Sequence, residues 1–581
     1  MTTDLGFAWL KLPSGREVSI IDIPGHERFV KNMLAGAGGI DFALLIVAAD
    51  EGVMPQTREH LAILDLLQVK GGVVAITKKD LVGEEELELA TMEVEELVKG
   101  TTLAQAPILA VSAVTGEGLP QLVSAIDNLL DSALPKKDIG RPRLSIDRVF
   151  TMAGSGTVVT GTLMDGCFSL GQTVEVLPSG LKARIRGLQT HKRRIDTAMP
   201  GSRVAINLAG IAMHELNRGN LVTTPGWLIP SKTLDVKLRL LPNFPRPLTH
   251  NASVTLYAGA SQVGGKVRLL DKEKLMPGET GWAQLVTAQP AMVVKGDRFI
   301  LRRSEETIGG GEVVDPLAKR HRRFHQATLE SLMARGEGVL QESLVATLES
   351  KGPMELVKLQ AYCNLSSSEA KMVVRDLALK KQVVMLGDNE TSLLFSARGW
   401  ERLVEKTKAM VQDYGKRFPL RPGMPGQELR NRLNLSSHAF APCLQLLLQT
   451  DVLVEDKGTL RLPSFQIQLA PEQQAAIKSF LDSLARHPYS PPSELTLDRE
   501  LLGLLIEQRQ VVKVSDSVVF PTSAYEEMVG LVTSHIKSQG KITLAEVRDL
   551  LGTSRKYAQA LMEHLDARGV TRRIGDERVL K

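Results

Sequence analysis

The spacing of apolar residues changes twice along the 581-residue chain. Residues 1–138 alternate short apolar runs with helix-length segments, and residues 139–323 consist of short β-type runs between Gly and Pro turns. Residues 324–581 repeat a mainly helical pattern. Because one hydrophobic core rarely serves more than about 250–300 residues, the chain has to form several domains of different classes.

The first part of the chain predicts a parallel α/β sheet. Its apolar runs are short, unbroken and rich in Val, Ile and Leu, which is typical of strands that are covered on both faces. The expected strands are 18–23, 42–49, 72–76 and 107–111, and the expected helices are 28–38, 55–68, 84–99 and 119–133. Residues 134–137 then predict a linker, so the first domain covers 1–138.

The middle part predicts two antiparallel β domains, 139–228 and 229–323. Short β-rich runs recur between Gly and Pro turns, and no long amphipathic helix interrupts them. Two barrels or two sandwiches fit this spacing. Two glycine runs of the chain, 36–39 and 309–311, are interpreted as turns.

The last part predicts four tandem winged-helix modules. Each contains a pair of helices followed by a hairpin, and the hairpins begin at residues 383, 452, 511 and 571. Hydroxyl groups in the segments 365–369, 435–437 and 553–554 are expected to cap a helix in three modules, whereas the third module has no clear cap. The expected modules are 324–398, 399–465, 466–524 and 525–581.

The net charge of +5 hides an uneven distribution. The three parts of the chain carry net charges of −10, +13 and +2 in order, counted from their Lys, Arg, Asp and Glu residues. A basic middle part predicts a polyanionic partner such as RNA, because neutralising phosphates provides much of nucleic-acid affinity. The alternative is a mixed, solvated surface.

Neither a secretory signal nor a membrane span is apparent, since no apolar run approaches the roughly 20 residues that cross a bilayer. The three cysteines, Cys167, Cys363 and Cys443, are far apart. An odd number at this spacing argues against a disulfide framework or a multi-cysteine zinc site and favours the cytoplasm.

A phosphate-binding motif follows the first expected strand. It reads Asp22-Ile23-Pro24-Gly25-His26-Glu27. A carboxylate at a strand end can hold a Mg²⁺ water, and Gly25 leaves its N–H accessible to a terminal phosphate. His26 can orient an attacking water. The alternative for an isolated motif of this kind is an acidic turn.

Two further motifs follow later strands and point to guanine. Thr77-Lys78-Lys79-Asp80 follows strand 72–76, and Ser112-Ala113 follows strand 107–111. A carboxylate at Asp80 accepts two hydrogen bonds from guanine, which adenine does not offer, and the stem of Lys78 can cover the base. Taken alone, each motif is also compatible with an ordinary loop. Together they lie where α/β sheets bind ligands.

These motifs resemble those of translational GTPases, and in detail those of the selenocysteine-specific elongation factors (SelB type). The resemblance rests on TDLGFA at 3–8, PGHERFVKNMLAGAGGID at 24–41, TREHLAIL at 57–64, and RPRLSIDRVFTMAGSGTVVTG at 141–161. It implies a GTPase domain, two β-barrels and four winged helices. It also implies GTP and Mg²⁺ as ligands, with selenocysteyl-tRNA, an mRNA hairpin and the ribosome as partners of a monomeric factor.

The resemblance also assigns residues beyond the GTPase domain. Asp147, Arg148 and Arg203 match positions around the aminoacyl group, and His191 is a further candidate. A cationic pocket would separate an anionic selenolate from the neutral serine hydroxyl, although Arg148 could instead merely pair with Asp147. In the last module the expected RNA-binding residues are Arg555, Lys556, Arg572 and Arg573. The alternative there is a solvated charged face.

One expected element is missing from the 581 residues: no GxxxxGK[ST] phosphate loop occurs. In the family this loop lies upstream of a switch segment, and Met1-Thr2 matches the end of that segment. Thr2 would then be a magnesium ligand together with Asp22. We therefore expect a truncated chain that binds and hydrolyses GTP poorly.

Three other functions fit parts of the sequence. The chain could be an RNA-binding fragment without enzymatic activity, or another tRNA-carrying GTPase. It could also be a DNA-binding regulator, since winged helices often bind DNA. The guanine motifs and barrels disfavour the regulator, and the four C-terminal modules disfavour another tRNA carrier.

Overall fold

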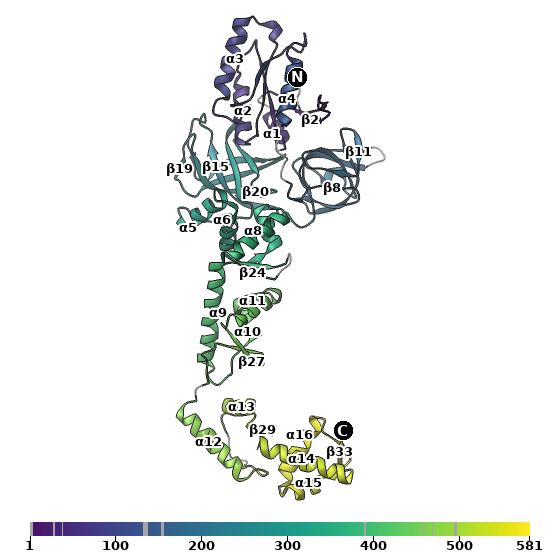
Figure 1. Cartoon of the computed structure of the whole chain (residues 1–581), viewed down its shortest axis with the longest axis vertical. Helices are drawn as coiled ribbons and strands as arrows, with labels where there is room; N and C mark the ends of the chain where they lie inside the picture. The colour runs from purple at the N-terminus through teal and green to yellow at the C-terminus, as the bar shows by residue number, and fades with distance from the viewer. Residues whose placement is uncertain are drawn as a thin grey trace. The chain divides into compact units, whose positions relative to one another are not determined.

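The computed structural model describes residues 4–26, 29–37, 39–131, 138–152, 156–387, 391–456, 458–467, 469–492 and 497–581. The chain divides into two compact units, Met1–Trp400 and Glu401–Lys581. Figure 1 shows the helices and strands of both. Across the described residues, no helix has the length and apolar character needed to cross a bilayer.

Strands β3 (Ala43–Ala48), β4 (Gly72–Thr77) and β5 (Ile108–Ala110) form the predicted parallel sheet. The accompanying helices are α1 (Val30–Ala37), α2 (Pro55–Leu66), α3 (Glu84–Val98) and α4 (Leu119–Asp131), with a 3₁₀ turn, η2 (Lys79–Leu81), after β4. Apolar side chains of β3 and β4 pack against those of α2 and α3 in one core. Burial on both faces accounts for the unbroken apolar run of β4, whereas in β3 only alternate residues, Leu45 and Val47, are buried.

The expectation that strand 18–23 belongs to this sheet is wrong. Strand β2 (Glu17–Asp22) pairs antiparallel with β1 (Gly6–Lys11), which the sequence pattern does not predict, and the two form a separate hairpin. Among the described strands β3 pairs only with β4, and Leu44 and Ile46 on its second face are exposed. The hairpin of β1 and β2 therefore does not cover this face of β3.

The first β domain is a closed barrel. Strand β10 pairs with both β13 and β9, which closes a ring in the order β10-β13-β7-β6-β14-β9, and β11 extends β10. The elements are β6 (Arg143–Met152), β7 (Gly156–Asp165), β8 (Phe168–Ser169), β9 (Thr173–Leu177), β10 (Leu181–Thr190), β11 (Arg193–Ile195), β12 (Thr197–Ala198), β13 (Arg203–Ala209), η3 (Met213–Glu215) and β14 (Leu221–Thr223). Alternate residues of these strands fill the barrel interior.

The second β domain is also a closed barrel, in the order β15-β20-β18-β17-β21-β22. Its strands are β15 (Ser231–Leu240), β16 (Leu248–Thr249), β17 (Ala252–Ala258), β18 (Ser261–Leu269), β19 (Lys274–Leu275), β20 (Thr280–Ala291), β21 (Arg298–Arg303) and β22 (Glu306–Asp315). Helices α1 and α2 pack on this barrel through an apolar cluster that includes Met33, Ile63, Tyr257 and Ile300. Both β domains are therefore barrels and not sandwiches, the two folds that fit the sequence pattern.

The glycines at 309–311, expected in a turn, lie inside strand β22. A Cβ atom at Gly309 would lie 2.3 Å from the Arg239 carbonyl oxygen, and one at Gly311 would lie 1.9 Å from that of Lys237. At Gly310 the corresponding distance to the Phe299 oxygen is 2.4 Å. Neighbouring strands therefore approach too closely for any side chain. Gly36 is likewise inside helix α1 and not in a turn.

A first winged-helix module completes the first unit. It contains α5 (Gln326–Gly336), α6 (Leu340–Lys351), α7 (Leu356–Cys363), α8 (Ser367–Leu379), β23 (Met354–Glu355), β24 (Val383–Leu386) and β25 (Leu393–Ser396). Helix α9 (Ala397–Arg417) follows. Leu332 of α5 packs against Trp282 and Val314 of the second barrel. The module is thus joined directly to that barrel.

The second unit contains the remaining modules. One has α10 (Gly426–Leu433), α11 (Ser437–Gln449), β26 (Met424–Pro425), β27 (Val454–Asp456) and β28 (Thr459–Arg461). The next has α12 (Pro471–Arg486), α13 (Arg499–Glu507), β29 (Val511–Ser515) and β30 (Val518–Pro521). The last has α14 (Thr522–Gln539), α15 (Leu544–Leu551), α16 (Arg555–Ala567), β31 (Ile542–Thr543), β32 (Thr571–Ile574) and β33 (Glu577–Leu580). The boundaries of the seven predicted domains stay predictions.

The expected helix caps are confirmed in part. The hydroxyls of Ser366 and Ser436 accept the N3 amides of α8 and α11. Ser554 precedes α16 but makes no side-chain cap bond, and Thr553 donates instead to the carbonyl oxygen of Tyr489. The third module does have a cap, because Asp498 accepts the amides of Glu500 and Leu501 at the start of α13.

Two buried carboxylates in the second barrel are neutralised from outside it. Asp235 and Asp315 are direct partners on β15 and β22. The Asp315 carboxylate lies 2.7 Å from the Arg335 guanidinium and 2.8 Å from the Lys351 ammonium. Burial would raise the pKa of Asp315, but the charges of Lys351 and Arg335 outweigh it and hold the pKa below its usual value. Asp235 accepts from Gln284 and contacts His321 at 2.7 Å.

Replacing Asp315 by Asn should lower the free energy of unfolding of the first unit by about 3–5 kcal/mol, because Arg335 and Lys351 would remain buried without their carboxylate. The matched control is Glu337→Gln, which removes the exposed partner of Lys237 and should cost less than about 1 kcal/mol. Chemical denaturation of the whole chain measures both. Equal stability of the two variants would contradict this role for Asp315.

Candidate functional site

The two guanine motifs lie side by side at the carboxyl edge of the parallel sheet. Thr77 ends β4, and the amide of Lys79 donates to the carbonyl oxygen of Val111, which follows β5. Ser112 is fully buried, and its hydroxyl accepts the amides of Val114 and Thr115. This bonding fixes the loop that contains Ala113. Asp80 is exposed at the same edge.

Lys78 adopts a left-handed backbone conformation with φ of 60°. Its ammonium lies 2.8 Å from Asp50 and 3.0 Å from Glu51, in the loop after β3. The hydrogen bonds to Asp50 and then Glu51 raise the pKa of Lys78. Its stem therefore extends over the edge of the sheet between two neighbouring loops. A planar base can be covered there.

The phosphate motif is placed on the hairpin and not in the parallel sheet. Asp22 ends β2, and Gly25 is exposed, with open space where a Cβ would be. His26 is half-buried, and its ring centroid lies 6.0 Å from that of Phe29. Pro24 is buried beside them. The expected common sheet edge for all three motifs is thus wrong, since among the strands that the structure describes β2 pairs only with β1.

The described residues suit the guanine end of a magnesium-bound nucleotide better than its phosphate end. The guanine end is present, with an exposed carboxylate and a rigid serine loop. At the phosphate end the described residues offer Asp22 and the accessible N–H of Gly25. The described part of the chain contains no group of three or more His, Cys, Asp or Glu residues that could hold a metal ion. Thr2 lies outside the described residues.

A β-bulge at Asp147 shapes the predicted aminoacyl pocket. The register between β6 and β7 shifts between Ile146 and Arg148, so Asp147 is the extra residue. A bulge changes the direction of the following side chains. The Asp147 carboxylate accepts two bonds from Arg203 of β13, at 2.5 and 2.9 Å, and one from Thr160 at 2.8 Å. Arg203, and not Arg148, is therefore the partner of Asp147.

Arg148 instead reaches the hairpin of β1 and β2. Its guanidinium donates to the carbonyl oxygen of Leu5 at 2.5 Å and lies 3.3 Å from the Asp4 carboxylate. The ring of Phe7 lies under both guanidinium groups, with centroid distances of 3.3 Å to Arg203 and 4.9 Å to Arg148. The two cations and one aromatic ring form a single cluster.

His191 contacts another part of the same hairpin. It lies in the turn between β10 and β11, with φ of 47°. Its ring nitrogens lie 2.8 Å from the Ser19 hydroxyl and 3.4 Å from the Glu17 carboxylate. Its ring centroid is 6.0 Å from that of Trp9. All four predicted aminoacyl residues therefore belong to one interface between the hairpin and the first barrel, but His191 is set apart from the other three.

Sequence reasoning missed the hairpin residues that complete this interface. Phe7 and Trp9 alternate along β1, and Trp9 is 46% exposed. Aromatic residues at alternate positions are typical of strands, so Phe7 and Trp9 are the sequence signal that could have marked a strand with a functional face. The pairing of β1 with β2 was needed to place it.

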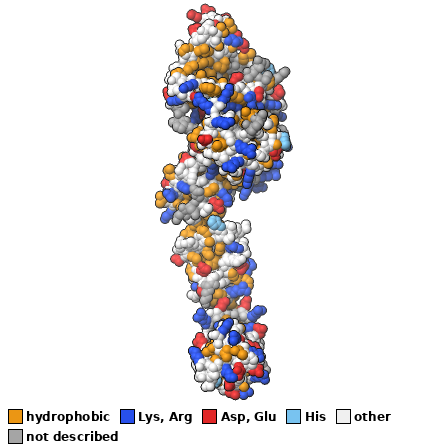
Figure 2. All heavy atoms as spheres, turned by 90° about the vertical axis from the view of Figure 1, so that its right-hand side faces the viewer, with side chains coloured by type: hydrophobic (Ala, Val, Ile, Leu, Met, Phe, Trp, Pro, Cys, Tyr) orange, Lys and Arg blue, Asp and Glu red, His pale blue; other side chains and the backbone are white. Residues whose placement is uncertain are grey.

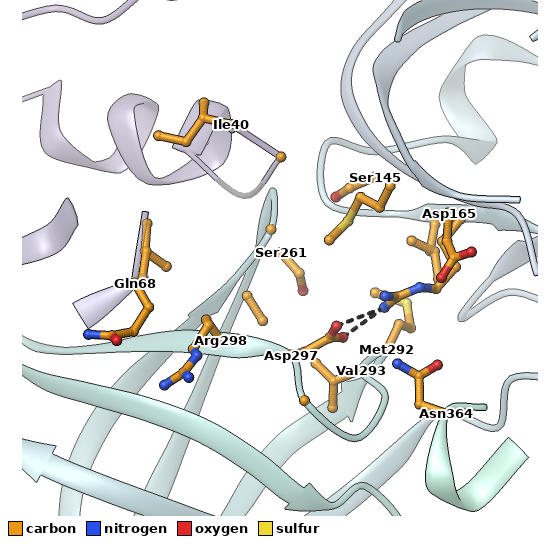
Figure 3. A pocket seen from close by; sticks show the side chains of 18 of the residues that line it. Ile40, Gln68, Ser145, Asp165, Ser261, Met292, Val293, Asp297, Arg298 and Asn364 are labelled. Atoms are coloured by element: carbon orange, nitrogen blue, oxygen red, sulfur yellow. Dashed lines mark hydrogen bonds and ion pairs between the residues drawn. The ribbon is translucent and has the colours of Figure 1, made fainter. Parts of the chain in front are cut away.

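A cavity of about 430 Å³ lies where the α/β domain, both barrels and the first winged helix meet. Figure 3 shows Ile40 and Gln68 on one side and Asp165, Asp297 and Asn364 on the other. The Asp297 carboxylate accepts two bonds from the buried Arg143, at 3.0 and 2.8 Å. None of the predicted site residues lines this cavity, which therefore belongs to the junction of the domains.

Among the described residues that line this junction, Asp165 is a buried carboxylate whose pKa is shifted. Its side chain accepts the amides of Ile139 and Gly166, both at 2.8 Å. Burial, together with the hydrogen bond to the Asp138 side chain, nevertheless raises the pKa of Asp165 to about 6. The junction therefore gains a buried negative charge as the pH rises through this range.

The four predicted RNA-binding residues of the last module are all exposed. Arg555 and Lys556 begin α16, and Arg572 and Arg573 lie on β32 of the wing. Arg578 of the same wing is buried and pairs with Asp566, so it supports the fold. In the space-filling view, Lys and Arg side chains are numerous over the barrels of the first unit (Figure 2).

Comparison with known proteins agrees with this architecture. Family models match residues 2–132 (elongation factor Tu GTP-binding domain), 156–223 (elongation factor Tu domain 2), 234–320 (selenocysteine-specific elongation factor β-barrel), and 409–462 and 534–580 (elongation factor SelB winged helices). A selenocysteine-specific elongation factor of Desulfomicrobium baculatum is 36% identical over 599 residues, covering 100% of this chain and 94% of its own length. The chain belongs to the selenocysteine-specific elongation factors.

A second relative supports the membership, and a solved structure supports the fold. The selenocysteine-specific elongation factor of Escherichia coli K12 is 31% identical, with 100% of this chain and 93% of its own length covered. The crystal structure of a bacterial selenocysteine-specific elongation factor, EF-Sec, has a TM-score of 0.72 at 24% identity over 100% of this chain and 93% of that one. The predicted fold class, a GTPase domain with two barrels and winged helices, is thus confirmed.

Asp165→Asn should change the dependence of stability on pH. The folded pKa of about 6 lies above the ordinary value of 3.8. The stabilising contribution of protonated Asp165 is therefore complete below about pH 4 and is lost as the pH rises through 6. Asn keeps the acceptor oxygen and stays neutral. The free energy of unfolding of Asp165→Asn, relative to that of the wild type, should therefore rise by roughly 2 kcal/mol between pH 4.5 and 7.5.

Thermal unfolding at the two pH values measures this difference. Asp196→Asn, at an exposed position of the same barrel, is the control. A pH-independent difference between wild type and Asp165→Asn would show that Asp165 does not titrate in this range.

Proposed function

We propose that this chain carries selenocysteyl-tRNA to ribosomes that translate a recoded UGA codon, as a GTP-dependent elongation factor. The observation that supports this most directly is the cluster of Arg148, Arg203 and Phe7 between the β1–β2 hairpin and the first barrel. A selenolate is anionic at neutral pH, whereas a serine hydroxyl is neutral. Two guanidinium groups in a partly buried site can distinguish them by charge.

The two arginines have different parts in this proposal. Arg203 is neutralised by the buried Asp147, which fixes its position. Arg148 has an exposed carboxylate partner, Asp4, and a carbonyl oxygen. An incoming selenolate can replace Asp4 at Arg148 without leaving a buried charge unpaired. We therefore assign recognition of the selenium atom to Arg148 and its positioning to Asp147 and Arg203.

The hairpin links cargo and nucleotide in this proposal. Strand β2 ends at Asp22, and its partner β1 contains Phe7. A change at the phosphate motif therefore reaches the cationic cluster through one pair of hydrogen-bonded strands. His191, held by Ser19 and Glu17, keeps the hairpin in register with the barrel.

Arg148→Gln should weaken binding of selenocysteyl-tRNA about ten-fold or more and leave binding of seryl-tRNA nearly unchanged, because only the selenolate needs the positive charge. Arg186→Gln, at an exposed position on β10, is the matched control. Protection of the aminoacyl ester from hydrolysis, measured with excess GTP, reports binding of both tRNAs. Equal losses for the two tRNAs would contradict a role in selenium recognition.

We further propose that the 581 residues by themselves bind and hydrolyse GTP only weakly, so that this polypeptide would need GTP in excess to carry its tRNA. Its sequence has no GxxxxGK[ST] loop, whose amides and lysine would hold the phosphates. The base contacts of Asp80 and Ser112 alone would give weak affinity. Were the nucleotide held, His26 would orient the attacking water, with Mg²⁺ at Asp22.

For the mRNA, we propose that Arg555 and Lys556 bind phosphates of a hairpin and that Arg572 and Arg573 contact its loop. Exposed cations at a helix start and on a wing suit phosphates and unstacked bases. The factor would act as a monomer in the cytoplasm. Its free cysteines fit that compartment.

Two fluorescence titrations test the weak GTP binding and the hairpin contact. Titration with GTP should not saturate below about 100 µM, because the charge-assisted phosphate contacts are missing. Titration with an RNA hairpin should saturate, and the double change Arg572→Gln and Arg573→Gln should lower its salt dependence by about two counterions. Tight GTP binding would disprove the deficiency, and preference for duplex DNA would favour a regulator.

A further inference from the structure

A second cavity, of about 320 Å³, lies in the second unit beside the second winged-helix module. Its lining comes from the last turns of α9, the segment before α10, strand β28 and the residues that follow β28. The apolar part of the lining includes Val411, Tyr414, Met424, Leu460, Leu462 and Phe465. The volume is close to the lower end of the range for small-molecule sites, which suits a ligand about the size of one nucleotide.

An aromatic surface forms one wall of this cavity. Phe465 is half-buried and lies directly against Gly415 of α9. A Cβ atom at Gly415 would lie only 2.8 Å from Phe465 Cε2, so the glycine lets the ring approach the helix. Tyr414 is buried next to it, and its hydroxyl accepts a bond from Arg421 at 3.0 Å. The ring of Phe465 is thus held in place but still reaches the cavity.

The charged residues that line the cavity are all cations. They are Lys416, Arg421 and Arg461, and no carboxylate is among the lining residues. Arg461 donates to the carbonyl oxygen of Phe465, and Arg421 lies 4.2 Å from the ring centroid of Phe418. Asp413 pairs with Arg417 and Glu428 with Arg432, and Glu500 and Glu428 also act electrostatically on Arg421. The rim therefore favours an anion.

We infer that this cavity binds one nucleotide of single-stranded RNA, with the base against Phe465 and the phosphate beside Lys416 and Arg421. Stacking on an aromatic side chain together with backbone neutralisation is how single strands are held. A base within a duplex is stacked between its neighbours, so it cannot place its face on the ring of Phe465. This contact is separate from the hairpin contact proposed for residues 525–581 and does not depend on it.

The test uses the full chain and a fluorescein-labelled hexauridylate that contains one 5-iodouridine. Ultraviolet crosslinking followed by mass spectrometry should identify a peptide that contains Phe465 or Tyr414. In anisotropy titrations, Phe465→Ala should weaken binding about five-fold or more, because one stacked base is lost. Arg421→Gln should reduce the salt dependence by about one counterion. Lys406→Gln, an exposed cation of α9 outside the cavity, should change neither.

All titrations are repeated in a chain that also carries Arg572→Gln and Arg573→Gln, which removes the wing contact of the last module. Crosslinks confined to residues 525–581, or equal effects of Arg421→Gln and Lys406→Gln, would overturn the inference. Circular dichroism checks folding. If Phe465→Ala unfolds the module, Arg421→Gln and Arg461→Gln decide the question. Preference for an acidic peptide over the oligonucleotide would also overturn it.

Discussion

Asp235 and Asp315 impose the strongest constraint on this molecule, because they are cross-strand partners inside a closed barrel. Both are almost fully buried. Like charges opposite each other on neighbouring strands are destabilising, and burial increases their cost. The cations that compensate them, Arg335 and Lys351, come from helices α5 and α6, outside the barrel. The second barrel and the first winged helix therefore need each other.

This dependence explains where the chain divides. The sequence pattern changes from β to helical near residue 324, but the compact unit continues to Trp400. An isolated barrel that ended at the change of pattern would retain both carboxylates and lose both cations. Helices α1 and α2 are attached to the same barrel through an apolar cluster and through Arg239 and Asp65. The second barrel is thus the element to which the GTPase domain and the first winged helix are both fixed.

The hairpin of β1 and β2 has a comparable role at the first barrel. It is not part of the parallel sheet, so its side chains are available to Arg148, Arg203 and His191. The bulge at Asp147 lets two consecutive residues serve this interface, although successive residues of a regular strand point to opposite faces. A local irregularity in one strand therefore determines which cations meet at the site.

Much of the fold was predictable from sequence because it depends on local pattern. Strands β3, β4 and β5 read as apolar runs, and Ser366 and Ser436 read as helix caps. The guanine motifs follow strands and lie at one sheet edge as expected. The partner of β2, the bulge at Asp147 and the burial of Arg335 were not predictable, since each depends on a residue far away in sequence. Charge alone could not tell Arg203 from Arg148 as the partner of Asp147.

The glycines of β22 have a consequence for genetics. Their strand lies between β15 and β21 at a distance that leaves no room for even one methyl group at Gly309, Gly310 or Gly311. Any missense allele at these codons would therefore force the barrel apart, and with it the support of the GTPase domain. A screen for lost function of the protein would recover these alleles whether or not the changed residue contacts a ligand. Severity of phenotype is consequently a poor guide to which residues of this protein touch RNA or nucleotide.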